Sequence, residues 1–142
     1  ESWVADFASW DVCDQCCINL FRHHATAFDK VTTWAAREEE FVRRAGFALL
    51  ATLAVHKKQE PDQTFIDFFP LIEHYAFDNR NFVKKAVNWA LRQIGKRNKA
   101  LNLAAIGVSN RILEQDTPPT RWIANDALRE LHDKKILARF KN

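Results

Sequence analysis

Three cysteines and two histidines near the start of the chain have the residue types that bind zinc. The candidate ligands are Cys13, Cys16, His23 and His24. On a helix, however, the three thiols and Leu20 follow the i, i+3, i+4, i+7 spacing of a buried stripe, where free cysteine behaves as a small hydrophobe. Structural zinc sites also usually join two separated ligand pairs, and no second pair follows. We therefore interpret these cysteines as buried thiols and expect no metal and no other cofactor.

The same stretch, SWDVCDQCC, contains Trp10 and Asp14. These residues are four positions apart, so on a helix their side chains project from one side. With the cysteines turned toward the core, Asp14 is expected at the boundary or exposed. From spacing alone, a solvated acid beside a half-buried tryptophan is the simpler interpretation.

Two further segments carry clustered positive charge. In EEEFVRRAGFALL the apolar stripe is expected to leave Arg43 and Arg44 off the core, with one facing water and the other able to reach a ligand or an acid. The planar guanidinium of arginine suits phosphate.

The segment NRNFVKKAVNWALRQIGKRNKAL has six basic residues and no acid between Lys84 and Lys99. Four side chains share one helical stripe: Lys85, Trp89, Arg92 and Lys96. A solvated helix face normally mixes its charges, so this bias indicates a phosphate backbone as partner. A basic surface helix with a structural tryptophan is the alternative.

These residues must be positioned by helices, because apolar residues recur at helical spacing along nearly the whole chain and only three glycines and four prolines interrupt it. We predict helices over residues 3–9, 10–24, 26–37, 38–57, 61–78, 79–97, 99–115 and 118–139. The short linkers predict antiparallel neighbours, and the hairpins repeat at roughly 40 residues, as in HEAT-like solenoids. The prediction is an all-α, right-handed HEAT-like solenoid, with a compact helical bundle as the alternative.

The bulk composition limits the remaining possibilities. A chain of 142 residues is long enough for one domain, which we assign to residues 1–142. No apolar run reaches the length of a membrane span, so no membrane partner is expected. Three clustered cysteines are typical of reduced thiols, which favours a reducing compartment such as the cytoplasm, with the bacterial nucleoid as one setting. The sequence shows no Ser–His–Asp order, Gly-rich phosphate loop or HExxH motif, so an enzyme built on it would act without a nucleophilic triad or a metal.

The motifs SWDVCD, FVRRAGFALL and FVKKAVNWALRQIGKRN, taken in order over roughly residues 1–130, resemble the DNA alkylation repair family of HEAT-like alkylpurine DNA glycosylases. The resemblance implies a solenoid whose concave basic face holds duplex DNA. It also implies hydrolysis of the N-glycosidic bond of cationic alkylated purines, such as N3- and N7-methylpurines, without drawing the base into a pocket. Duplex DNA containing alkylated bases is then the expected partner.

Carried over by position, the resemblance implies that Asp14 is the catalytic carboxylate. It also implies that Trp10 and Trp89 are the aromatic residues of the cleft, and that Arg44 contacts the DNA backbone. Lys85, Arg92 and Lys96 would add sequence-independent affinity for DNA.

Compared with the family pattern, we expect the N-terminal repeats and one aromatic contact to be missing from this chain. Tyr75, the single tyrosine, is not in the place of that contact. We expect a monomer, or a chain that packs against a missing N-terminal half. The alternative function is a non-catalytic HEAT-like scaffold for nucleic acid or protein, since a fold alone does not determine activity.

Overall fold

The described part of the protein, residues 27–140 of a computed structural model, is built entirely from helices. The elements are α3 (Ala27–Ala35), α4 (Glu40–His56), α5 (Asp62–Ile66), α6 (Phe69–Tyr75), α7 (Asn81–Gly95), α8 (Lys99–Glu114), α9 (Pro118–Leu131) and α10 (Lys134–Ala138). The all-α prediction is therefore confirmed.

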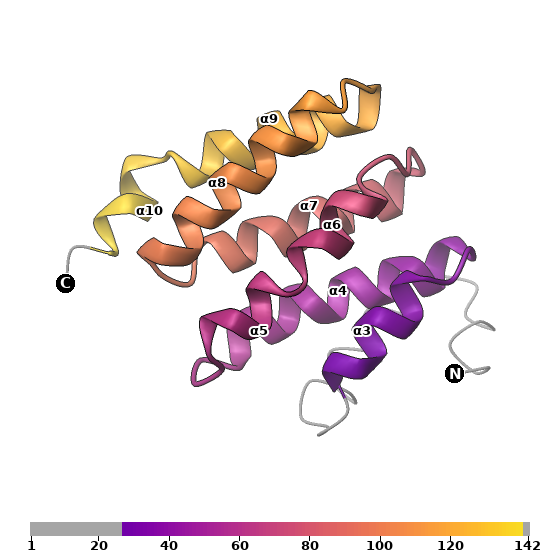
Figure 1. Cartoon of the computed structure of the whole chain (residues 1–142), viewed down its shortest axis with the longest axis horizontal. Helices are drawn as coiled ribbons and strands as arrows, with labels where there is room; N and C mark the ends of the chain where they lie inside the picture. Colours follow the sequence, from indigo (N-terminus) through magenta and orange to yellow (C-terminus); the bar gives the residue numbers. More distant parts are fainter. Residues whose placement is uncertain (1–26, 141–142) are drawn as a thin grey trace.

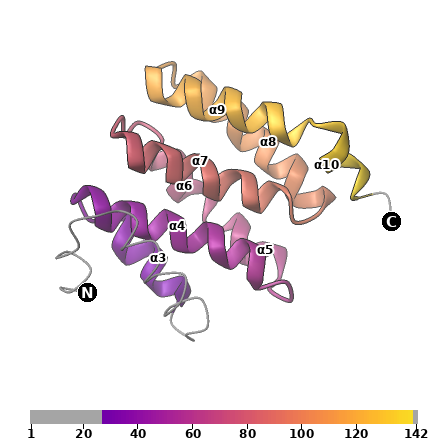
Figure 2. The same cartoon turned by 180° about the vertical axis from the view of Figure 1, so that it is seen from behind.

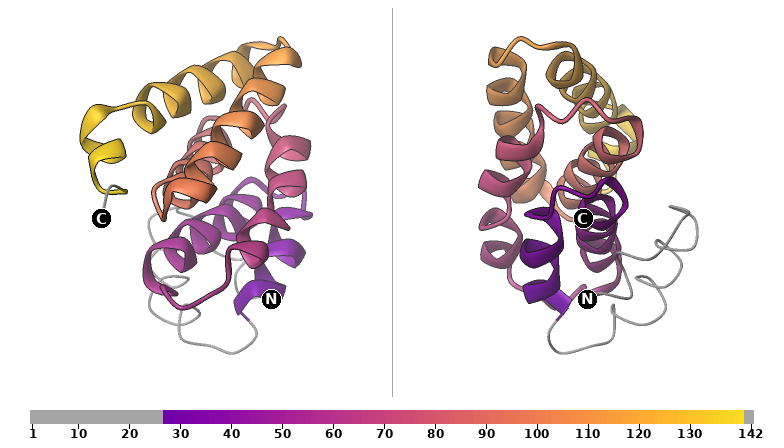
Figure 3. Two further views of the ribbon diagram at one scale, coloured as in Figure 1. Left: turned by 60° about the vertical axis from the view of Figure 1, so that its left-hand side comes forward. Right: turned by 90° about the vertical axis from the view of Figure 1, so that its right-hand side faces the viewer.

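The helices form two layers. One layer contains α4, α7 and α9, and the other contains α3, the α5–α6 segment and α8 (Figure 1, with the reverse side in Figure 2). The right-hand view in Figure 3 shows the two layers as separate columns. Within its layer α7 packs against both α4 and α9, and successive helices along the chain alternate between the layers. This stacking of helix pairs agrees with the predicted hairpins, while the right-handed solenoid stays a prediction.

Close packing of the first pair depends on Gly46 in α4. A Cβ atom at this position would lie 2.6 Å from the backbone nitrogen of Ala35 and 2.9 Å from the carbonyl oxygen of Val31. Real Cβ atoms essentially never lie this close to other heavy atoms. The opposing atoms belong to the backbone of α3, which cannot shift as easily as a flexible side chain. Glycine therefore sets how near α3 approaches α4.

Two predicted helices are each divided in the structure. The region predicted as 61–78 ends its first helix at Ile66 and restarts at Phe69. Pro70 explains the division, because a proline has no N–H to donate to the carbonyl of Ile66, and its ring clashes with that carbonyl in a continuous helix. The region predicted as 118–139 stops at Leu131, and Asp133 caps a new helix by accepting a hydrogen bond from the Lys135 amide at 2.8 Å.

Buried amide side chains tie the helix pairs together inside the core. Asn102 of α8 donates from Nδ2 to the carbonyl oxygens of Gly95 and Leu131, at 3.2 and 3.1 Å. Asn88 of α7 donates to the carbonyl oxygen of Ile123 at 3.1 Å. Both asparagines are almost fully buried. Because a buried amide without partners is costly, these bonds fix the register of α7, α8 and α9.

Candidate nucleic-acid interface

A shallow cleft of about 340 Å³ lies between α4 and α7. It is lined by Arg44, Phe82, Lys85, Trp89 and Arg92. Four of these residues, all except Phe82, are candidates from the sequence, although Arg44 comes from a different segment than the others. We call this feature the α4–α7 cleft.

The amphipathic pattern of α7 explains how its side chains reach the cleft. Lys85, Trp89 and Arg92 follow at helical spacing, while the opposite side of α7 buries Val83, Ala86, Val87, Ala90, Leu91 and Ile94. Lys85 is exposed. Trp89 is partly buried and packs against the hydrophobic core, so the core holds one part of the indole and the rest borders the cleft.

Both arginines of the α4 pair are buried, each with 7% of its surface exposed. The expectation that one of them faces water is therefore wrong, because α4 lies between neighbours and is buried along residues 42–54. Arg44 donates from Nη1 to the carbonyl oxygen of Phe82 at 2.8 Å. This bond joins α4 to the start of α7 and holds the guanidinium at the edge of the cleft, so little side-chain entropy is left to lose on contact with a phosphate.

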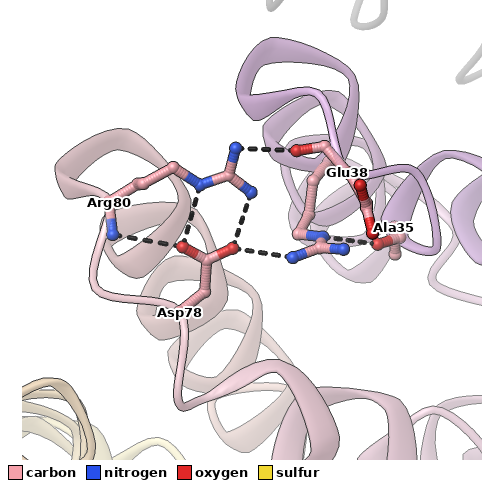
Figure 4. A network of polar contacts seen from close by, with 5 residues as sticks. Ala35, Glu38, Asp78 and Arg80 are labelled. Atoms are coloured by element: carbon pink, nitrogen blue, oxygen red, sulfur yellow. Dashed lines mark hydrogen bonds and ion pairs between the residues drawn. The ribbon is translucent and has the colours of Figure 1, made fainter.

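Arg43 belongs to a different site, a polar network with Ala35, Asp78 and Arg80 at the ends of the helices (Figure 4). It donates to the carbonyl oxygen of Ala35 at 2.9 Å and to Asp78 Oδ2 at 2.8 Å. Arg80 donates to the same carboxylate at 2.8 Å and to the carbonyl oxygen of Glu38 at 2.7 Å. The network therefore joins the turn between α3 and α4 to the turn that precedes α7.

The ionisation of Asp78 follows from this network. Burial alone would raise the pKa of its carboxyl group, but the hydrogen bonds from Arg80 and Arg43 outweigh burial and lower the pKa below its usual value. Asp78 thus remains a carboxylate, and it fixes the turn from which α7 begins. In consequence it also fixes where Phe82 and Lys85 stand relative to Arg44.

Arg92 and Lys96 are paired with acids of α9. Arg92 Nη1 lies 2.6 Å from Glu130 Oε2, and Lys96 Nζ lies 2.7 Å from Glu130 Oε1. Arg92 Nε is also 3.8 Å from Asp126 Oδ2. Burial would raise the pKa of Glu130, but hydrogen bonds from Lys96 and Arg92 outweigh it and lower the pKa. The basic stripe of α7 therefore has no acid in its own segment, but acids of α9 pair with two of its cations, Arg92 and Lys96.

Glu130 and Asp126 are site residues that the sequence pattern did not reveal. Their i, i+4 spacing places both on one side of the predicted last helix, which is a usable signal. That signal does not tell which helix the pair faces, because that depends on the packing of α9 against α7.

Lys96 lies apart from the α4–α7 cleft. It borders a second cavity, of about 490 Å³, together with Arg97 and Arg139. Arg97 donates to the carbonyl oxygens of Ala54 and Glu60 at 2.7 and 3.1 Å and lies over the Phe65 ring at 4.1 Å. Arg97 thus hydrogen-bonds carbonyl groups at the C-terminal end of α4 and in the loop that follows it.

The remaining sequence candidates, Trp10 and Asp14, lie outside the described residues, as does the cluster of cysteines and histidines at positions 13–24. Within residues 27–140 no group of three or more metal-binding side chains comes together. None of the helices in that range is both long enough and apolar enough to cross a bilayer.

Comparison with known proteins identifies the family. The family described as DNA alkylation repair enzyme matches residues 1–131, which is most of the chain. Searches of curated proteins and of solved structures returned no match. The family match covers the segment with Trp10 and Asp14 as well as the α4–α7 cleft. The chain therefore belongs to the DNA alkylation repair enzyme family.

Proposed function

We propose that this protein is a DNA glycosylase that hydrolyses the N-glycosidic bond of cationic alkylated purines, such as N3- and N7-methylpurines, in duplex DNA. One observation carries the proposal: a single cleft brings together an arginine of α4 with the lysine, tryptophan and arginine of α7. A cleft with positive charge and one aromatic surface suits a strand of DNA with a modified base.

The chemistry of the substrate explains which groups are needed. A purine alkylated at N3 or N7 already carries positive charge, so it departs without a general acid and leaves an oxocarbenium-like sugar. A carboxylate stabilises such a sugar, as in glycoside hydrolysis in general. In the proposal Asp14 supplies this carboxylate and orients the attacking water. No metal ion is required for these steps.

The described residues would hold the DNA around that reaction. Arg44, oriented by its hydrogen bond to Phe82, would bind a phosphate beside the lesion. Trp89, together with Trp10, would contact the cationic nucleotide through its ring face, worth about 0.5–2 kcal/mol for each ring. Lys85 would bind phosphate directly. Arg92 and Lys96 would do so only by exchanging Glu130 for a phosphate.

The test is release of base from duplex DNA that contains N7-methylguanine. Wild type should release the base, and Asp14→Asn should abolish release while binding DNA as well as wild type or slightly better, because one negative charge is removed. Asp11→Asn, the same change three residues earlier, is the matched control and should remain active.

Two results would count against the proposal. Wild type that binds DNA in a salt-sensitive way but releases no base would favour a non-catalytic HEAT-like scaffold. Loss of folding in Asp14→Asn, measured by circular dichroism, would make Asp14 a structural residue.

A further inference from the structure

Side chains of α7 and α9 meet at three successive levels. At the first level, Lys84 Nζ lies 5.1 Å from the centre of the Trp122 ring. At the next, Arg92 reaches Asp126 and Glu130, and at the last, Lys96 reaches Glu130. The cations are spaced at helical intervals on one side of α7, and the hydrogen bond from Asn88 to Ile123 holds the two helices in this register.

The partner of the cation differs between these levels. Arg92 and Lys96 face carboxylates, which neutralise them. Lys84 faces an aromatic ring, whose quadrupole attracts the ammonium group but carries no net charge. Among the described residues, no carboxylate lies within ion-pair distance of Lys84 or of its neighbour Lys85. The cation at the first level therefore has no carboxylate partner among the described residues, whereas the cations at the other two levels are paired with carboxylates.

Trp122 is unusually exposed for a tryptophan, with 39% of its surface accessible, whereas Trp34 is fully buried and Trp89 is partly buried. The two arginines of α9 are also paired: Arg121 with Asp116, and Arg129 with Asp126, which contacts Arg92 as well. A flat apolar ring beside one unneutralised lysine, with a second lysine next in sequence at the edge of the cleft, matches the sugar–phosphate backbone, which offers an apolar sugar face next to an anionic oxygen.

We propose that Lys84, Lys85 and Trp122 form a second DNA contact, in which the lysines bind phosphate and the indole packs on the adjoining sugar. Because Lys85 also lines the α4–α7 cleft, this contact extends the cleft toward α9. It would bind the part of the DNA backbone that lies beyond the lesion. The inference rests on the proposed function only in that duplex DNA is the ligand.

The experiment measures the affinity of the whole chain for an undamaged DNA duplex over a salt series. Trp122→Ala should weaken binding about fivefold or more, with an unchanged salt dependence, because an uncharged contact is lost. Lys84→Ala should make the negative slope of log K against log salt shallower by about 0.9, since one phosphate contact is lost. Leu103→Ala is the matched control: Leu103 is 60% exposed on α8, in the other layer, and should leave affinity unchanged.

A purely structural role for Trp122 predicts that affinity falls only as folded protein is lost, so the thermal unfolding midpoints of all variants are measured alongside. Under the proposal, Trp122→Phe keeps an aromatic ring and should recover most of the affinity that Trp122→Ala loses. Affinity equal to wild type in folded Trp122→Ala would overturn the inference. So would a loss of affinity that only follows a loss of folded protein.

The outcome also separates this inference from the proposed activity. Wild type that releases N7-methylguanine, with Trp122→Ala binding equally well, would overturn the second contact alone. Wild type that releases no base, with binding that still depends on Trp122, would overturn the glycosylase and leave the contact in place. Tighter binding of single strands than of duplex, lost in Trp122→Ala, would overturn the backbone contact, since it would indicate base stacking instead.

Discussion

Replacing Glu130 with glutamine should make the protein bind DNA more tightly. The carboxylate oxygens of Glu130 lie 2.6 Å from Arg92 Nη1 and 2.7 Å from Lys96 Nζ. One carboxylate therefore pairs with two cations that could otherwise bind phosphates. Asp126 contacts Arg92 as well but also pairs with Arg129, so Glu130 is the main counter-charge of Arg92 and Lys96. The glutamine is nearly the same size but leaves one more positive charge uncompensated.

The magnitude follows from counterion release. One additional effective phosphate contact steepens the dependence of log K on log salt by about 0.9, which corresponds to about eightfold tighter binding at about 0.1 M salt and about fourfold at about 0.2 M. The cost in stability should lie between about 1 kcal/mol, as for an exposed pair, and about 3 kcal/mol, as for a buried pair, because the side chains of Arg92 and Glu130 are about a quarter exposed.

Fluorescence anisotropy with an undamaged duplex at several salt concentrations measures both the affinity and the slope. Glu114→Gln serves as the matched control, since Glu114 is exposed on α8, in the opposite layer, and removes the same charge. Weaker binding by Glu130→Gln, or a slope equal to that of the control, would refute the idea that Glu130 competes with phosphate. It would mean that Arg92 and Lys96 only join α7 to α9.

Two further predictions concern stability. Gly46→Ala should lower the free energy of unfolding by about 1–3 kcal/mol in urea titrations, because its Cβ would press on the backbone of α3; an unchanged midpoint would show that α3 moves freely. Asp78→Asn should cost about 3 kcal/mol or more at neutral pH by leaving Arg43 buried without its carboxylate. Because the pKa of Asp78 is lowered by folding, its contribution is complete above the unfolded value of about 4 and is lost as pH falls through the folded value. The difference between wild type and Asp78→Asn should therefore shrink in acid, and a difference that is constant with pH would contradict this account.

Helical periodicity predicted the elements that carry the cleft because α7 is strongly amphipathic and is bounded by clear breaks. The predicted range 79–97 corresponds to Asn81–Gly95, and 99–115 corresponds to Lys99–Glu114. The pattern fails over 61–78. The apolar spacing continues through Pro70, but the helical hydrogen bonds of the backbone cannot continue there, because proline has no N–H.

The site was predictable where it depends on one helix and not where it depends on two. The spacing of Lys85, Trp89 and Arg92 within α7 was enough to bring them to one surface. The contact of Arg44 with Phe82 and that of Arg92 with Glu130 each join two helices through residues 38 positions apart in sequence. Such contacts depend on tertiary packing, which periodicity does not contain.

The buried side chain of Asn102 has a consequence for how the protein opens. Its two hydrogen bonds reach the last turns of both α7 and α9, and Asn88 of α7 donates a further bond to Ile123 of α9. The pair formed by α8 and α9 therefore cannot separate from α7 without breaking the Asn102–Gly95 and Asn88–Ile123 bonds together. Stacked helix pairs otherwise tend to unfold one at a time, starting from an end. Here the end of the stack is joined to its middle, and α7, α8 and α9 should behave as one cooperative unit. The surface that α7 and α9 share would then be lost or kept as a whole, with no partly open state that retains half of it.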